Sequence, residues 1–223
     1  MRVICSFEST VVLDDVRRPM LDAFADPAWR DIETQWEDGE ITAAERSQLQ
    51  TALIRATDAE LDAFLDRARI DPAFIRFAAW CRNEGIPMAI VSDGVDRFIQ
   101  RILAAHGLTH MAIVANELGG PEGRRTLSQP WGRAGCAAGS GVCKCDVAVI
   151  EALNDDLLVY VGADRSDFCV SARADVLFAR GELAEYAAAR KRGYFGFRTF
   201  DDIAAVLVRL RGPAHGRPAL QVV

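Results

Sequence analysis

Residues 2–15 read RVICSFESTVVLDD, a short apolar run followed by the polar residues Glu8, Ser9 and Thr10. The apolar run favours a β-strand over residues 2–6 that is buried on both faces. Polar residues that follow such a strand in an α/β protein lie at the sheet edge where ligands bind. The stretch therefore predicts an active-site position, yet the uncharged Ser6 stands where a reactive group is expected.

The pattern of this opening strand recurs along the chain. Two further runs read as strands and two weaker ones add to them: residues 88–92 (MAIVS), 157–162 (LLVYVG), 111–115 (MAIVA) and 175–179 (DVLFA). Helical patterns lie between these runs, at residues 96–107, 146–154 and 181–193. Strands that alternate with helices predict an α/β fold with a parallel sheet and right-handed crossovers.

One block interrupts this alternation. Residues 14–79 show helical periodicity without a strand candidate, and Thr42 with Glu45 has the spacing of a capping box. A helical block inserted after the first strand would lie above that strand's end. We therefore expect an inserted helical cap at residues 14–79 and a core formed by residues 1–13 and 80–223.

Two segments have little periodicity. The stretch from Gly119 to Gly141 is rich in Gly, Arg and Ala and predicts a long loop, a kind of segment that often carries function. Residues 211–223 predict a frayed terminus.

The composition argues against several classes of protein. The net charge of −6 and the lack of a long basic run argue against nucleic acid as a partner. No apolar run approaches the roughly 20 residues that span a bilayer, so we expect no membrane partner. The sequence shows no secretory leader pattern, and we expect a cytoplasmic protein.

Polar residues follow each expected strand and would meet at one sheet edge. They are Ser6, Glu8, Ser9 and Thr10, then Ser92, Asp93 and Gly94 opening a helix, then Lys144, and finally Asp164 and Asp167. Hydroxyl and backbone N–H groups would hold phosphate oxygens, a lysine would offset their charge, and carboxylates would hold Mg²⁺. Taken singly, Ser92 could be a helix N-cap, Lys144 a surface lysine and Asp167 a helix-dipole partner.

Several motifs together resemble the haloacid dehalogenase superfamily. VICSFEST stands where that family has C-D-F-D-G-T, AIVSDGVDRFIQRIL matches its second motif, CKCDVAVIEAL resembles its lysine motif, and VYVGADRSDFCVSARADVLFAR resembles its G-D-G-x-S-D stretch. The likeness is greatest to the phosphoserine-phosphatase branch and to the methionine-salvage phosphatases that act on a diketo-methylthiopentyl phosphate. It covers nearly the whole chain and implies a three-layer Rossmann-like core with an inserted all-helical cap of C1 type.

The resemblance also implies site residues. In that family an aspartate forms an aspartyl-phosphate, a second aspartate acts as acid and base, and Mg²⁺ is bound. By position the nucleophile falls on Ser6, the acid/base on Glu8 and the two late aspartates on Ala163 and Asp167. Phosphate binding falls on Thr10, on Ser92, Asp93 and Gly94, and on Lys144.

The sequence departs from the family pattern at the residues that carry out phosphate transfer: the nucleophile, the acid/base and a metal ligand. A serine hydroxyl at position 6 is uncharged, so it is a poor Mg²⁺ ligand and a weak nucleophile. The extra methylene of Glu8 displaces its carboxylate, and such misplacement can cost about 10²-fold in rate. Ala163 removes a metal ligand; Asp164 beside it could substitute and bind the metal together with Asp167, although neighbouring residues point in different directions. We therefore expect no classical aspartyl-phosphate phosphatase activity, and the expectation of Mg²⁺ is weakened.

Three functional hypotheses stay open from the sequence. The first is a protein that binds a phosphorylated or anionic small molecule, or a protein partner, without hydrolysis. The second is a divergent hydrolase, phosphatase or lyase that uses Ser6 activated by Glu8, or Glu8 alone as a base. The third is an assembly protein with a vestigial site. Homodimer formation is left open.

The cysteines allow several interpretations. Six cysteines in 223 residues do not form a disulfide scaffold. Cys136, Cys143 and Cys145 could bind zinc together with His106 or His110, although the spacing is not a standard one. A disulfide or redox pair between Cys136 and Cys143 is a second interpretation, and free structural thiols are the third.

Overall fold

The computed structural model describes residues 1–151 and 157–211. Within them a seven-stranded sheet runs in the order β4-β3-β2-β1-β5-β6-β7. The strands are β1 (Arg2–Cys5), β2 (Met88–Val95), β3 (Ala112–Gly119), β4 (Thr126–Ser128), β5 (Leu158–Gly162), β6 (Val176–Ala179) and β7 (Phe195–Gly196). Neighbouring strands are parallel except for the β3–β4 pair. The predicted parallel α/β sheet is confirmed.

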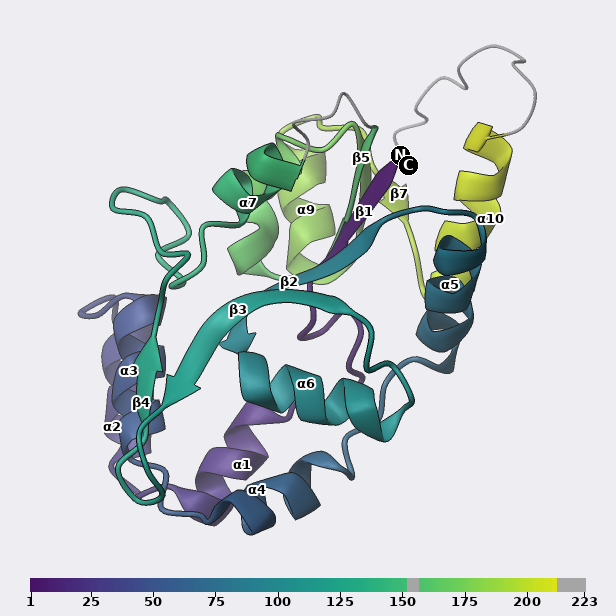
Figure 1. Ribbon diagram of the computed structural model, residues 1–223. Helices are drawn as coiled ribbons and strands as arrows, with labels where there is room; N and C mark the ends of the chain where they lie inside the picture. Colours follow the sequence, from purple (N-terminus) through teal and green to yellow (C-terminus); the bar gives the residue numbers. More distant parts are fainter. Residues whose placement is uncertain (152–156, 212–223) are drawn as a thin grey trace.

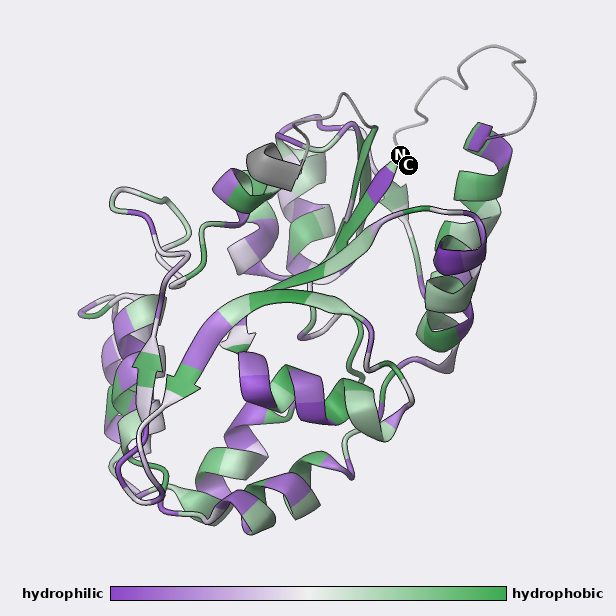
Figure 2. Ribbon diagram, viewed as in Figure 1, coloured by the Kyte–Doolittle hydropathy of each residue, from purple (hydrophilic) through white to green (hydrophobic). Residues whose placement is uncertain are grey.

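Helices cover both faces of the sheet (Figure 1). They are α1 (Arg17–Phe24), α2 (Trp29–Glu37), α3 (Ala43–Ala52), α4 (Asp58–Leu65), α5 (Pro72–Asn83), α6 (Asp96–Ala105), α7 (Lys144–Glu151), the 3₁₀ turn η1 (Arg165–Asp167), α8 (Phe168–Ser171), α9 (Gly181–Ala189) and α10 (Phe200–Arg211). Alternate residues of one strand serve opposite faces, since Val3 and Cys5 pack with α5, α6 and α10, whereas Ile4 packs with α7, α8 and α9. The result is the expected three-layer core, and its central strands are strongly hydrophobic (Figure 2).

Helices α1 to α4 form a block after β1, as the sequence indicates (Figure 1). The capping box of Thr42 and Glu45 is present. Helix α5 packs against α10 through Phe74 and Phe200, whose rings lie 4.8 Å apart. The expected division between residues 79 and 80 thus falls inside α5, and the division into cap and core stays a prediction.

Two expectations about local structure are wrong. Ser92, Asp93 and Gly94 do not open a helix, because β2 continues to Val95 and α6 begins at Asp96. The strand persists because its pairing with β3 resumes at Val95 after a register shift. The stretch from Gly119 to Gly141 is not only a loop, since it contains β4, which pairs antiparallel with the end of β3.

Other expectations lie at the margins of the described chain. The helix predicted over 146–154 is present as α7, which begins at Lys144, but residues 152–154 lie outside the described residues. So does the predicted frayed terminus, apart from its first residue. No helix in the described ranges has the length and apolar character that crossing a bilayer requires.

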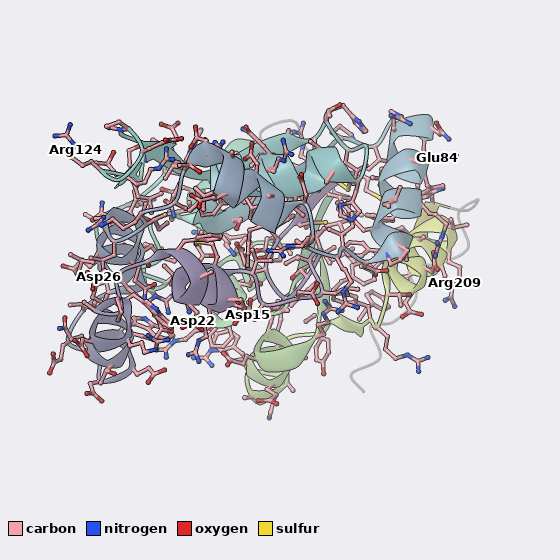
Figure 3. The ribbon with its side chains drawn as sticks, turned by 90° about the horizontal axis from the view of Figure 1, so that it is seen from below. Asp15, Asp22, Asp26, Glu84, Arg124 and Arg209 are labelled. Carbon is pink, nitrogen blue, oxygen red and sulfur yellow. The ribbon has the colours of Figure 1, made fainter. Side chains whose placement is uncertain are left out.

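Charged side chains surround this core. Seen from below, the labelled Asp15, Asp22 and Asp26 lie along the helical block, whereas Glu84 and Arg209 lie at the opposite end beside α5 and α10 (Figure 3). Glu84 is also bonded to Arg211 of α10 at 2.8 Å.

Candidate active site

The ammonium group of Lys144 lies at the centre of the candidate site. Lys144 is the first residue of α7, and its side chain is buried. Its Nζ donates to Ser6 Oγ at 3.1 Å, Ser166 Oγ at 2.9 Å and Asp167 Oδ1 at 2.7 Å. These acceptors use all three N–H bonds of a lysine. The buried Lys144 side chain therefore connects the start of α7 by hydrogen bonds to the end of β1 and to η1.

Asp167 is the main counter-ion of Lys144. Its Oδ1 also accepts from Tyr160 Oη at 2.6 Å, and its Oδ2 accepts the backbone N–H groups of Ala163 and Asp164 at 2.8 and 3.1 Å. A carboxylate offers about four lone-pair positions, so the protein itself uses the full capacity of Asp167. Burial acts to raise the pKa of Asp167, but Lys144 and the hydrogen bonds outweigh it and the pKa falls below its usual value.

The pKa of Lys144 is shifted in the complementary direction. Burial alone would lower it, but the charges of Asp167 and Asp93 outweigh burial and raise the pKa of Lys144 above its usual value. The Asp93 Oδ1 atom lies 3.4 Å from Nζ. Lys144 thus stays protonated across the neutral range, and it cannot serve as a base toward Ser6.

Glu8 is bonded to Ser92. The Ser92 hydroxyl donates to Glu8 Oε2 at 2.6 Å and accepts the Gly94 N–H at 2.9 Å. A Cβ atom on Gly94 would collide with Glu8 Oε1, so a larger residue at position 94 would displace this carboxyl group. Burial, and then the charge of Asp93, raise the pKa of Glu8 to about 7. The residue retains some exposed surface, but the atoms packed around its carboxyl group remove most of its hydration.

The remaining predicted residues lie around this centre. Burial, and then the charge of Asp167, raise the pKa of Asp164 to about 6. The Asp93 carbonyl accepts from Asn116 Nδ2 at 2.7 Å. Thr10 Oγ1 is buried and has no hydrogen-bond partner among the described residues. The structure thus brings all the predicted site residues to one edge, but it commits Ser92, Lys144 and Asp167 to protein partners.

Ser9 adopts a backbone conformation that glycine takes more easily than serine does. Its φ of 53° lies in the left-handed region, which favours glycine over residues with a Cβ. Arg180, which follows β6, holds this turn by donating to the Ser9 carbonyl at 2.6 Å and to the Thr10 carbonyl at 3.1 Å. Sequence reasoning missed Arg180, although it follows a predicted strand and the strand-end rule would have found it.

Arg46 is a second residue that the sequence did not reveal. It lies on α3 in the helical block, and its guanidinium stacks 3.9 Å from the centre of the Trp36 ring. Burial, and then the charge of Arg17, lower the pKa of Arg46 to about 10, while Glu33 and Asp93 act in the opposite direction. The helical block thus brings a partly buried positive charge within electrostatic reach of Asp93. No sequence signal marks Arg46, because this approach depends on how α3 packs.

Magnesium does not fit this set of residues. Ser6 is neutral and accepts a hydrogen bond from an ammonium group, Ala163 has no ligand atom, and the lone pairs of Asp167 are used. The raised pKa of Asp164 disfavours its charged form. Across residues 1–151 and 157–211, no three His, Cys, Asp or Glu side chains are arranged to hold a metal ion. Asp93 is paired with Lys144, and Glu8 accepts from Ser92 and has a raised pKa. Few anionic oxygen atoms are therefore free to bind Mg²⁺, which takes such ligands from proteins.

Comparison with known sequences points to one family. Residues 7–172 match the haloacid dehalogenase-like hydrolases, a match that begins just after Ser6. The 2-hydroxy-3-keto-5-methylthiopentenyl-1-phosphate phosphatase of Brevibacillus brevis is 26% identical over 214 residues, which cover 94% of this chain and 96% of that protein. The protein of the same name from Exiguobacterium sibiricum is 29% identical over 209 residues, with 91% and 94% covered.

Solved structures show the same fold. A substrate-bound phosphoserine phosphatase complex superposes with a TM-score of 0.66 at 16% identity, covering 92% of this chain and 97% of that one. A probable phosphoserine phosphatase from Vibrio cholerae gives a TM-score of 0.68 at 16% identity, covering 95% of this chain and 67% of that one. At such identities the likeness concerns the arrangement of strands and helices.

Proposed function

The chain belongs to the haloacid dehalogenase-like hydrolase family, and we propose that it binds a phosphorylated or otherwise anionic small molecule without aspartyl-phosphate chemistry. The observation that carries this proposal is the bond from Lys144 Nζ to Ser6 Oγ. An ammonium donor withdraws electron density from the hydroxyl, and Lys144 cannot take its proton. Ser6 therefore lacks both the charge of a carboxylate and the base that a serine nucleophile needs.

Glu8 does not supply that missing base. Its carboxyl group accepts from Ser92, whereas Ser6 accepts from Lys144, so the two candidate catalytic residues have separate partners. Stabilising a phosphoenzyme would also need positive charge beyond Lys144, and Asp167 already neutralises that lysine.

A bound anion is supported by the charges at this edge of the sheet. Arg46 contributes positive charge within electrostatic reach of Asp93, in addition to the Lys144–Asp167 pair. The raised pKa values of Glu8 and Asp164, about 7 and 6, let both groups take up a proton when an anion approaches. The names of the relatives, which describe phosphatases of a phosphorylated methylthiopentenyl compound, support a phosphorylated ligand in particular. We also propose that the protein is cytoplasmic. Binding to a protein partner and formation of a homodimer stay predictions.

A second candidate function is acid–base chemistry by Glu8 alone. A carboxyl group with a pKa of about 7 is well matched to proton transfer at neutral pH. This function would need neither Ser6 nor a metal ion, and the Glu8→Gln variant would abolish it.

A phosphatase screen with and without Mg²⁺ tests the proposal. We would compare the wild type with the triple variant Ser6→Asp/Glu8→Asp/Ala163→Asp and with a matched double variant that keeps Ser6. We expect Mg²⁺-dependent hydrolysis only in the triple variant, at least about 10²-fold above the others, because it alone restores nucleophile and metal ligands together. Wild-type hydrolysis with Mg²⁺ at roughly 1 s⁻¹ or more would refute the proposal. Metal-independent turnover that Glu8→Gln removes would favour the second candidate.

A further inference from the structure

Four of the six cysteines gather beside Lys144. Cys143 and Cys145 flank it in the chain, Cys136 precedes them in the loop before α7, and Cys169 lies on α8. The Cys136 thiol lies close enough to Cys143 to influence the pKa of that thiol, and Cys145 influences the pKa of Cys169 in the same way. All are free thiols, and no part of the proposed ligand chemistry uses them.

The two pairs differ in their freedom to move. Cys145 and Cys169 belong to α7 and α8, whose helical backbones fix both residues. Cys136 lies in the segment GCAAGSG, where Gly135, Gly139 and Gly141 all have positive φ angles. A disulfide needs Cα atoms about 4.4–6.8 Å apart and a defined dihedral angle, and such a loop can adjust to those requirements. Cys136 is also partly exposed, whereas Cys143 is buried.

The loop that carries Cys136 connects the helical block to the site. The Gly139 carbonyl accepts the Ala44 N–H of α3 at 2.8 Å. The Cys143 N–H donates to the Trp131 carbonyl at 2.7 Å, and Lys144 follows directly. A covalent bond between positions 136 and 143 would therefore close the turn that lies between α3 and the central ammonium group.

We propose that Cys136 and Cys143 form a redox-active dithiol pair that closes to a disulfide in the folded protein and fastens this turn against α3. The oxidant is a low-molecular-weight disulfide. The partly exposed Cys136 thiolate attacks it and releases one thiolate; the Cys143 thiolate then attacks the mixed disulfide and releases the second. One protein S–S bond forms, two electrons pass to the oxidant, and the two protons leave with the released thiols. Such pairs in reducing compartments act as reversible sensors.

Burial, more than the neighbouring charges of Cys136 and Asp146, limits the speed of closure. It raises the pKa of the Cys143 thiol to about 11, so little of the resolving thiolate exists at neutral pH. Closure therefore becomes faster as the pH rises from 7 to 9, about tenfold per pH unit while the thiol remains mostly protonated.

Trypsin makes the pair easy to detect. Cleavage after Arg133 and Lys144 releases both cysteines in one peptide, residues 134–144, whereas Cys145 and Cys169 fall in separate peptides, 145–165 and 166–173. Native full-length protein would be equilibrated with glutathione disulfide, alkylated and digested. We expect peptide 134–144 to lose both alkylation sites and to be lighter than its reduced form by two hydrogen atoms. Cys136→Ser should abolish this change, and the control Cys81→Ser, in the apolar core, should leave it intact.

Four results would overturn the inference. They are full alkylation of peptide 134–144, a mixed disulfide at Cys136 that does not close, a cross-link between peptides 145–165 and 166–173 in its place, and stoichiometric zinc that protects all four thiols. Amide hydrogen exchange tests separately whether the disulfide stabilises the contact between this turn and α3. The Ala44 amide, bonded to Gly139, should exchange at least about threefold more slowly in the disulfide form, and unchanged exchange would refute that part of the proposal.

Discussion

The charge of Glu8 depends strongly on its surroundings. An ordinary glutamate is ionised at pH 7, but burial and Asp93 raise the pKa of Glu8 to about 7. The folded protein therefore binds more protons than the unfolded chain between about pH 4.5 and 7. Its free energy of unfolding should fall as the pH rises through that window and level off above it.

The Glu8→Gln variant tests this linkage. Glutamine keeps the acceptor for Ser92 but cannot ionise, so the variant should be more stable than the wild type at pH 8 by about 1–3 kcal/mol. The two proteins should have the same stability near pH 4, where Glu8 is protonated in both states. Urea unfolding at several pH values measures the difference, with the exposed Glu185→Gln as the control. Parallel pH profiles for wild type and Glu8→Gln would contradict the assigned shift.

The sequence revealed some site residues and concealed others for a physical reason. Ser6, Glu8, Lys144 and Asp167 could be predicted because each lies at a strand end or helix start, and parallel strands bring those positions together. Tyr160 could not, because it lies inside β5 and reaches Asp167 only through the bend at η1.

At the scale of elements, ion pairs join the helical block to the core. Asp62 of α4 and Asp66, which caps the end of that helix, pair with Arg97 and Arg101 of α6 at 3.1 Å and 2.5 Å, respectively. Arg125, which precedes β4, pairs with Asp58 at the start of α4. Arg125 is buried at 6% side-chain exposure, whereas Arg101 is 40% exposed. How much an ion pair contributes to the free energy of unfolding depends on its exposure, because water screens exposed charges.

We expect Arg125→Met and Arg101→Met to differ in stability. Arg125→Met should lower the free energy of unfolding by about 1–2 kcal/mol, since it removes a buried donor from Asp58 and from the Ala56 carbonyl. Arg101→Met should cost less than about 0.5 kcal/mol, and high salt should remove that cost. Urea unfolding at low and high salt provides the comparison. Equal losses of unfolding free energy in the two variants would show that burial does not determine how much these ion pairs stabilise the protein.

Elements with long regular patterns were predictable, and short ones were not. Helix α6 agrees with its predicted range to within two residues, because its apolar periodicity is strong. Strand β4 has only three residues, too few for a pattern, and its pairing with β3 supplies the stability that its sequence does not signal. The end of β2 was misjudged because Ser92, Asp93 and Gly94 resemble a helix start.

At the scale of the whole molecule, the fold and family followed from the alternation of strands and helices and from the motifs. The family match over residues 7–172 confirms the resemblance that those motifs indicated. The same fold supports many chemistries, however, so function depends on the charges at the sheet edge. There Ser6 and Ala163 carry no charge, and Asp167 is fully bonded within the protein.

A titration of Mn²⁺ followed by electron paramagnetic resonance tests this loss of charge most directly, since Mn²⁺ takes the same oxygen ligands as Mg²⁺. The wild type should bind Mn²⁺ no more tightly than about 1 mM, and Ser6→Asp/Glu8→Asp/Ala163→Asp at least about tenfold more tightly, because ligand charge sets affinity at such sites. One Mn²⁺ ion held by the wild type at about 10 µM, and displaced by Mg²⁺, would contradict the account.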